Sequence, residues 1–151
     1  MAIPLPPAMH HALQLAQAAA DAGEVPVGAV ILRDGVEIAA ASNAMRQLND
    51  PTAHAEILAI RAAAEALGQL RLEDCELWVT LEPCAMCAGA IAQARLARVY
   101  YAAPDPKGGG VDHGPRIFAQ PTCHHRPEVY SGLGESLAAD QLRRFFAAKR
   151  S

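Results

Sequence analysis

The sequence predicts an α/β fold, a three-layer α/β/α sandwich around a mixed central sheet of about five strands. Patterns typical of helices alternate with short β-branched runs along the chain, which favours helices packed around one sheet. A hairpin signal near the N-terminus opens that sheet. The chain has 151 residues, of which 52% are hydrophobic, so it has the size of one ordinary domain with a sizeable core. We therefore expect a single domain over residues 1–151.

The N-terminal part of the chain predicts a helix followed by a hairpin. Residues 7–22 carry apolar side chains at helical spacing and end at Gly23, a common helix stop. Residues 27–32 and 36–41 are predicted strands. Asp34-Gly35 between them is a strong signal for the tight turn of a hairpin.

A second helix is predicted after a polar loop over residues 42–50. The fixed φ of Pro51 suits the first helical position, with Asp50 or Thr52 as the cap, and Gly68 ends the helix. The side chains expected to face the sheet share helical spacing and are Ile57, Ile60, Ala64 and Leu67.

The second half of the chain predicts the rest of the sheet and its covering helices. The expected order is strand 76–81, helix 84–94, strand 98–103, a flexible turn over 104–110, irregular chain to about 127, strand 128–130 and helix 136–149. The helix over 84–94 is rich in small residues, namely Ala85, Ala88, Gly89 and Ala92. Small side chains let backbones come close, so this helix packs either on its own sheet or against a partner subunit. The sequence leaves both open.

Two cysteines open the predicted helix over 84–94 and are candidate metal ligands. Cys84 and Cys87 are three residues apart and therefore lie on one face of a helix. The free N–H groups at a helix N-terminus favour the thiolate, which is the form that binds metal. His54, in the first turn of the preceding predicted helix, supplies an imidazole. One imidazole and two thiolates can hold Zn²⁺ and leave the fourth tetrahedral position for water, as catalytic zinc sites do.

Glu56 is the candidate acid–base group beside this site. Zinc lowers the pKa of a bound water from about 15.7 to about 7, and a carboxylate that is not a ligand can then move protons. Glu56 lies two residues after His54, which suits that role. A non-enzymatic zinc module is a further hypothesis, but a structural site has no need of an acid in this position.

The remaining cysteines and the start of the chain bear on the cellular compartment. A Cys-x-x-Cys in a chain without a secretory signal favours metal binding over disulfides, so Cys75 and Cys123 are expected to be buried thiols. The N-terminal sequence has no basic segment before an apolar core, and no apolar run reaches the ~18 residues of a membrane span. We therefore expect a cytoplasmic protein that does not contact a membrane.

Four segments carry a resemblance to a known family. They are residues 49–56 (NDPTAHAE), 71–75 (RLEDC), 79–90 (VTLEPCAMCAGA) and 125–129 (HRPEV). His-x-Glu followed by Pro-Cys-x-x-Cys is a known signature of zinc nucleobase deaminases. Together the segments resemble the bacterial tRNA-specific adenosine deaminases, which belong to the cytidine and deoxycytidylate deaminase superfamily. The likeness extends from about Gly23 to the end of the chain.

The resemblance implies a cytidine deaminase-like fold and a homodimer that converts the wobble adenosine of a tRNA anticodon to inosine. It makes His54, Cys84 and Cys87 the zinc ligands and Glu56 the proton shuttle. The residues that it places near the purine or the RNA are Asn43, Asp105, Lys107, Phe145 and Phe146.

These substrate contacts have plainer readings that the sequence leaves open. Asn43 can be a turn former, and Asp105 and Lys107 can belong to a solvated loop. Adjacent residues on a helix project about 100° apart, so we expect at least one of Phe145 and Phe146 in the core. The other could stack on a splayed base.

The charge distribution bears on the RNA partner. The net charge of −3 is unusual for a nucleic-acid binder. Residues 1–94 carry four basic and eleven acidic residues, net −7, whereas residues 95–151 carry nine and five, net +4. The basic side chains of that second part include Lys107, Arg126, Arg143, Arg144, Lys149 and Arg150. They can form a local RNA-binding patch, or they can be the solvated end of a helix.

A deaminase of a free nucleobase or nucleoside, such as cytosine or guanine, is the alternative to a tRNA deaminase. It would need the same zinc core but no basic rim. The stretch over residues 111–115 has no evident role in RNA contact.

Overall fold

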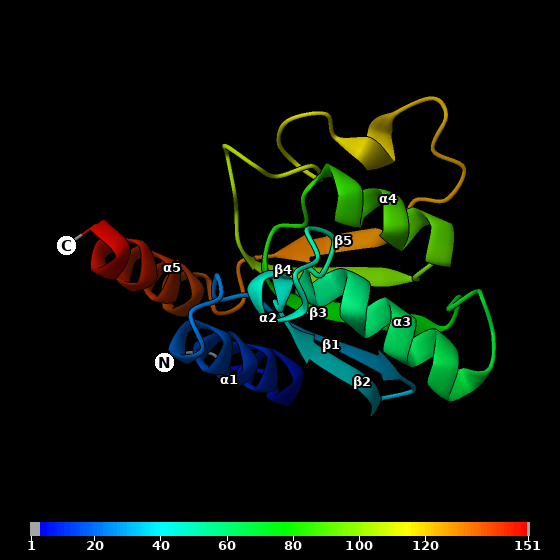
Figure 1. Cartoon of the computed structure of the whole chain (residues 1–151). Coiled ribbons are helices and arrows are strands. Elements are labelled where there is room, and N and C mark those ends of the chain that lie inside the picture. The colour runs from blue at the N-terminus through cyan, green and yellow to red at the C-terminus, as the bar shows by residue number, and fades with distance from the viewer. Residues whose placement is uncertain (1–3, 151) are drawn as a thin grey trace.

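A computed structural model describes residues 4–150 and has a five-stranded mixed sheet at its centre (Figure 1). The elements are α1 (Pro7–Asp21), β1 (Gly28–Arg33), β2 (Val36–Ser42), α2 (Met45–Leu48), α3 (Ala55–Leu67), β3 (Cys75–Leu81), α4 (Ala85–Ala94), β4 (Arg98–Ala103), the 3₁₀ helix η1 (Ile117–Ala119), β5 (Glu128–Ser131) and α5 (Glu135–Arg150). The strand order is β2-β1-β3-β4-β5. β1 is antiparallel to β2 and β3, whereas β3, β4 and β5 run parallel. The predicted fold class is confirmed.

Helices cover both faces of the sheet, with α3 and α4 on one face and α1 and α5 on the other (Figure 1). Successive side chains of a strand point to opposite faces, so each central strand supplies both cores. In β1, Ala29 and Ile31 belong to the core under α3 and α4, whereas Val30 belongs to the core under α1 and α5. Near-continuous hydrophobic strands such as β1 and β3 are therefore buried on both faces.

The hairpin between β1 and β2 forms where the sequence predicts it. Asp34 and Gly35 have φ angles of 52° and 77°, and two positive φ angles in succession are what a tight hairpin turn requires. Gly35 adopts this conformation at no steric cost, and Asp tolerates it better than most residues.

The start of α3 differs from the prediction. The helix begins at Ala55 with His54 as its N-cap, and Pro51 lies in a turn before it. Asp50 Oδ1 accepts hydrogen bonds from the N–H and the hydroxyl of Thr52, which closes this turn instead of capping a helix.

The buried face of α3 is also offset from the predicted one. Its fully buried residues are Ala55, Glu56, Ala59 and Ala63. All four residues predicted to face the sheet are only half-buried, and of these Ile60 and Leu67 pack against the core. Small alanines face the sheet because α3 lies close to β2 and β1.

The polar segment before α3, predicted as a loop, contains the short helix α2. Its N-terminus is held by the buried carboxylate of Glu24, which accepts hydrogen bonds from the N–H groups of Arg46 and Gln47 at 3.1 and 2.8 Å. A carboxylate at this end also complements the partial positive charge of the helix. A side chain 22 residues upstream therefore fixes the segment that precedes α3.

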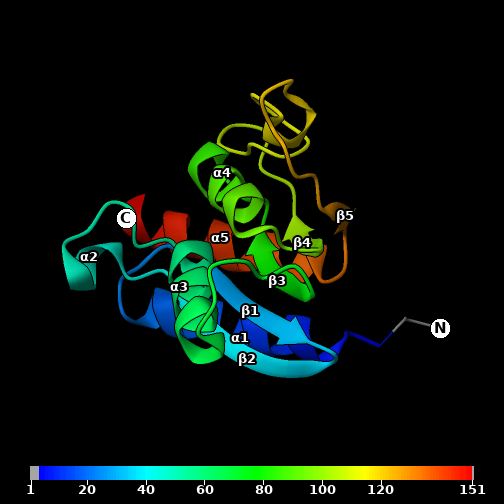
Figure 2. The same cartoon turned by 90° about the vertical axis from the view of Figure 1, so that its right-hand side faces the viewer.

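The long connection from β4 to β5 passes over α4 and carries η1 against it (yellow in Figures 1 and 2). The remaining boundaries lie within a residue or two of the predicted ones, including β5 and α5. Within residues 4–150, no helix combines the length and the apolar character that a membrane span requires.

Candidate metal centre and active site

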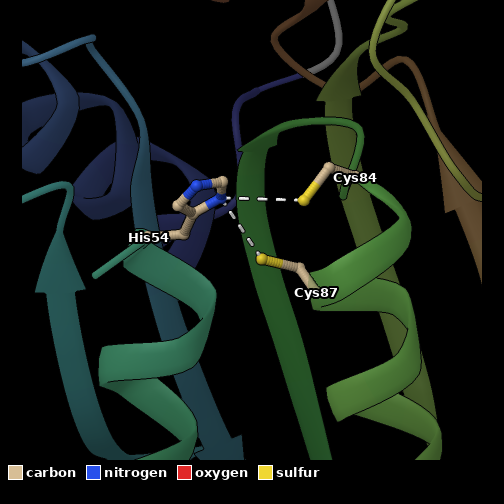
Figure 3. Close-up of side chains that lie close together, drawn as sticks. All are labelled: His54, Cys84 and Cys87. Carbon is tan, nitrogen blue, oxygen red and sulfur yellow. Dashed lines mark hydrogen bonds between the residues drawn. The ribbon is translucent and has the colours of Figure 1, made fainter. Parts of the chain in front are cut away.

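His54, Cys84 and Cys87 converge at the N-terminal ends of α3 and α4, and their side chains point toward one another (Figure 3). His54 is the N-cap of α3 and Cys84 is the N-cap of α4, each with an extended backbone. The His54 Nδ1 atom lies 3.7 Å from Cys84 Sγ and 3.5 Å from Cys87 Sγ. The two helices lie on the same face of the sheet, so their first turns bring together residues that are thirty positions apart.

The donor set fits a tetrahedral zinc ion. At ordinary Zn–N and Zn–S lengths, a nitrogen and a sulfur ligand are about 3.6 Å apart, which matches the separations between His54 and the two thiols. The three ligand atoms lie within 4.8 Å of one another, and no fourth His, Cys, Asp or Glu among the described residues joins them. The cluster therefore has the three-ligand composition of a catalytic zinc site.

The protons of this cluster are distributed unequally. The hydrogen bond from the Cys87 thiol, with help from His54 and the Cys87 N–H, outweighs burial and lowers the pKa of Cys84 to about 4. The same hydrogen bond, together with burial and Glu56, raises the pKa of Cys87. The hydrogen bond with Cys84 raises the pKa of His54. This environment favours the thiolate of Cys84, which is the form of cysteine that coordinates a metal.

Glu56 lies beside the cluster on the buried side of α3. Its side chain is only 4% exposed, and burial raises its pKa from 4.5 to about 7. The thiolate of Cys84 raises this pKa further, whereas the His54 imidazole lowers it. A carboxyl group with a pKa near neutrality can both take up and release a proton at physiological pH.

Asn43 joins the end of β2 to the first turn of α3. It is buried, and its Oδ1 accepts a hydrogen bond from the Ala55 N–H at 2.8 Å. Asn43 therefore caps α3 from outside the helix, since the N-cap residue His54 makes no side-chain cap bond. With Oδ1 engaged in this way, the Nδ2 group is the part of the amide suited to contact a substrate.

Glu82, which the sequence analysis missed, organises the segment after β4. Its carboxylate is 2% exposed and accepts hydrogen bonds from the N–H groups of Asp105, Val111, Asp112 and His113. His113 Nδ1 lies a further 2.7 Å from Glu82 Oε1. Burial alone would raise the pKa of Glu82, but the bonds from Asp105, His113 and the other amides outweigh it and hold the pKa below its usual value. Glu82 stands two residues before the candidate ligand Cys84, but the N–H groups that it binds leave no signal in the sequence.

Asp105 and Lys107 lie in this segment, in the turn that the sequence predicts as flexible. Asp105 Oδ1 accepts hydrogen bonds from the N–H groups of Lys107 and Gly108, which closes a tight turn. Gly109 and Gly110 are buried, and a Cβ at Gly110 would meet backbone atoms of Cys84 and Ala85 within 2.8 Å. The glycines therefore permit close packing on the first turn of α4. Lys107 is exposed at the tip of the turn.

Phe145 and Phe146 lie on α5, and neither is in the core. Phe145 is half-buried and Phe146 is 43% exposed, so the expectation of one core residue is wrong. The two rings pack edge to face, with centroids 5.3 Å apart. With Met45 and Arg46 of α2, the two rings line a pocket of about 300 Å³. Both rings are therefore partly open to solvent. The first part of α5 lies against one face of the sheet, and the rest of the helix extends away from the sheet (Figure 1).

The other predicted features have separate outcomes. Cys75 is buried, as expected, but Cys123 is only half-buried, and its thiol donates to the His125 carbonyl. All four cysteines are free thiols. Of the basic residues on α5, Arg143 and Arg144 both pair with Asp140, and Lys149 lies over the Phe145 ring.

Comparisons with known proteins agree with this site. The family profile described as the cytidine and deoxycytidylate deaminase zinc-binding region matches residues 6–103. A tRNA-specific adenosine deaminase of Agrobacterium fabrum is 59% identical over 142 residues, which cover 94% of this chain and 93% of that protein. A structure solved for tRNA:A34 deaminases, which carry out A-to-I editing at the wobble position, has a TM-score of 0.88 at 58% identity and covers 89% of this chain and 98% of its own.

A guanine deaminase from Bacillus subtilis is also similar, with a TM-score of 0.65 and 38% identity over 91% of each chain. The residues matched by the family profile include His54, Cys84 and Cys87. The chain belongs to the cytidine and deoxycytidylate deaminase family, and residues 6–103 contain the zinc-binding region of that family.

Proposed function

We propose that this protein is a zinc-dependent hydrolytic deaminase that converts the wobble adenosine of a tRNA anticodon to inosine. The observation that carries the proposal is the three-ligand cluster with a buried Glu56 beside it, in a chain 59% identical to a tRNA-specific adenosine deaminase. A substrate of this kind is found in the cytoplasm, so the proposal includes a cytoplasmic location.

The proposed ligands of zinc are His54, Cys84 and Cys87. When bound, zinc supplies a water of lowered pKa as the nucleophile. Glu56 would take up a proton from that water as the oxygen bonds to the carbon that bears the amino group, and would donate it to the adjacent ring nitrogen. It would then pass the second proton of the same oxygen to the amino group, and the C–N bond breaks to release ammonia. A pKa near 7 suits both halves of this transfer.

Asn43 is proposed to orient the purine. Its Oδ1 already accepts from the Ala55 N–H, so its Nδ2–H group is the one that meets an acceptor on the purine edge. Because the same side chain caps α3, the purine is positioned relative to the helix that carries Glu56.

The RNA around the purine is proposed to contact two separate regions. One is the turn that carries Asp105 and the exposed Lys107. The other is the pocket lined by Phe145, Phe146 and Lys149, where an aromatic face and a cation suit a splayed base and a phosphate. The net charge of +4 on residues 95–151 supports this assignment of the RNA-contacting half.

We also propose a homodimer that uses the outer face of α4. Ala88 packs on the sheet of its own chain, but Ala85 and Met86 are exposed and Gly89 is only half-buried. A Cβ at Gly89 would meet no atom within 4 Å in the described structure. Some small residues of α4 thus pack against the sheet of their own chain, and the others leave a smooth outer face on which a second chain can pack.

Deamination of a free base is the second candidate, supported by the 38% identity to a guanine deaminase. The test offers the purified zinc-loaded protein an anticodon stem-loop with adenosine at the wobble position, alongside free adenosine, cytosine and guanine. We expect inosine from the stem-loop and no turnover of the free compounds. Turnover of only a free base would overturn the tRNA proposal in favour of this candidate.

A further inference from the structure

A single buried carboxylate connects the candidate metal centre to the turn proposed to contact substrate. Glu82 follows β3 and comes two residues before Cys84, and its side chain is closed off from solvent. Its two carboxylate oxygens bind a segment more than twenty residues downstream. Oε1 accepts a hydrogen bond from the Asp105 N–H at 3.0 Å. Oε2 receives the N–H groups of Asp112 and His113 at 2.9 and 3.1 Å.

This arrangement fixes both ends of the segment over residues 105–113. The Asp105 N–H marks the start of the segment and His113 marks its end. Between them, the Gly110 N–H donates to the Pro83 carbonyl at 2.8 Å, so the middle lies on the turn that leads into Cys84. A Cβ at Gly109 would come within 2.5 Å of the Glu82 carboxylate, and Gly109 therefore allows the chain to close around it.

His113 adds the one side-chain contact of this set. Its Nδ1 lies 2.7 Å from Oε1, where an N–H can donate to an oxygen that also accepts from Asp105. Outside the segment, Tyr101 donates its hydroxyl to Asp112 Oδ2, which holds the same stretch against β4. The bonds to Glu82 need two acceptor oxygens, which a carboxylate has and a glutamine does not.

We propose that Glu82 is a positioning residue for the deamination reaction. It holds the segment over residues 105–113 against the Cys84 turn, with His113 as its side-chain clamp, and so sets where Asp105 and Lys107 meet the substrate. The effect on substrate rests on the proposed function. The attachment of the segment to Glu82 does not depend on that function.

The first experiment measures amide hydrogen exchange in the zinc-loaded wild type and in Glu82→Gln. Glutamine replaces one of the two acceptor oxygens by an NH₂ group. Depending on how its amide is oriented, either the Asp105 N–H or the N–H groups of Val111, Asp112 and His113 lose their acceptor. We expect the amides that lose their acceptor to exchange at least about tenfold faster, with zinc content unchanged. The matched control is Glu65→Gln, at an exposed position of α3. Unchanged exchange in Glu82→Gln would overturn the proposal.

The second experiment measures whether the position of the segment matters to substrate. In a Glu56→Ala background, which prevents turnover, the Kd for the anticodon stem-loop should rise at least about tenfold when Glu82→Gln is added and stay constant with Glu65→Gln. In the active protein, KM should rise more than kcat falls. Faster exchange with unchanged RNA affinity and KM would overturn the positioning role.

Variants of His113 keep the proposal testable if Glu82→Gln does not fold. His113→Ala removes the clamp and should raise KM, whereas His113→Asn retains a side-chain donor and should restore a KM near that of the wild type. Equal KM values in wild type and His113→Ala would contradict the clamp. If the wild type turns over only a free base, the tRNA proposal fails, and the same KM comparison on that base decides for or against Glu82.

Discussion

Two buried carboxylates near the metal centre have opposite environments and therefore different roles. Glu56 is buried beside the two thiols and His54, and burial raises its pKa to about 7. Glu82 accepts four backbone N–H groups, and these hold its pKa low despite burial. A carboxylate whose charged form is solvated by amides stays ionised and suits a structural task. One whose proton is easily moved suits acid–base catalysis.

The raised pKa of Glu56 predicts a stability cost in the metal-free protein. Its pKa is raised from 4.5 to about 7, so its contribution to stability is fully present below pH 4.5 and is lost as the pH rises through 7. A shift of this size corresponds to about 3 kcal/mol. Metal-free Glu56→Gln should avoid that loss, so its advantage in free energy of unfolding over wild type should grow between pH 4.5 and pH 8. Urea unfolding at both pH values measures it.

The control for this prediction is Glu65→Gln, which changes an exposed carboxylate on the same helix. It should unfold like the wild type at either pH. An advantage of Glu56→Gln that is equally large at pH 4.5 and pH 8 would contradict the assigned cause, because ionisation could not then explain it.

The two ends of the Asn43 amide predict separable effects. Asn43→Ala leaves the buried Ala55 N–H without its acceptor and should cost about 1–2 kcal/mol of unfolding free energy. Asn43→Asp keeps an acceptor oxygen and should remain close to wild-type stability. It lacks the Nδ2 donor, however, so kcat/KM for the stem-loop should fall at least about tenfold. Chemical unfolding and kinetics check the two variants. Full activity of Asn43→Asp would reduce Asn43 to a cap.

At the scale of elements, α4 has one face buried within its own chain and one face open to solvent. Ala88 and Ile91 pack in the core against the sheet and Cys87 is buried at the candidate metal centre, whereas Gly89 faces open space in the described chain. Glycine within a helix is destabilising by roughly 0.5–1 kcal/mol relative to alanine. No contact within the described chain requires a glycine at position 89. Close approach of a second chain would explain why a glycine stands there.

Gly89 therefore gives a test of the proposed dimer. Gly89→Ala should raise the stability of the monomer by about 0.5–1 kcal/mol and serves as the folding control. Gly89→Arg should leave each chain folded but separate the subunits, because a long cation cannot enter a close helix–helix contact. Sedimentation velocity over a range of concentrations measures the state of assembly. A wild type that stays monomeric throughout, or a Gly89→Arg protein that stays dimeric, would refute the proposed face.

Sequence patterns predict elements well where the signal is local. The hairpin at Asp34-Gly35 and the helix that starts after Cys84 depend on adjacent residues, and both form within a residue of the expected place. The start of α3 does not follow this rule. There, Asp50 binds Thr52 and Asn43 supplies the acceptor for Ala55, so distant partners decide where the helix begins.

The candidate site shows the same division between local and distant signals. His54, Glu56, Cys84 and Cys87 stand in two short motifs, so sequence alone could single them out. Glu24 and Glu82 act on backbone N–H groups more than twenty residues away, and backbone N–H groups leave no mark in a sequence. Their roles become visible only when the fold shows which amides they face.

At the scale of the whole molecule, the metal centre connects parts of the chain that the fold brings together on one face of the sheet. His54 is the N-cap of α3, Cys84 is the N-cap of α4 and Cys87 lies in the first turn of α4, with β3 between the two helices in sequence. The short distances between their ligand atoms depend on both helices keeping their places on the sheet. Binding of an ion to all three side chains is therefore coupled to the global fold.

Removal of zinc should for this reason lower the stability of the entire chain and not only abolish activity. Metal analysis should find about one zinc per chain, and at a free zinc concentration of about 1,000 times Kd the bound ion adds about 4 kcal/mol to the free energy of unfolding. For a chain of this size that corresponds to a fall in Tm of roughly 10 °C on chelation. Calorimetry with and without a chelator measures the fall. Cys84→Ser is the control, because a weakened ligand set should make the shift much smaller. A Tm that chelation leaves unchanged, in protein shown to have lost its metal, would mean that the three side chains do not hold an ion in common.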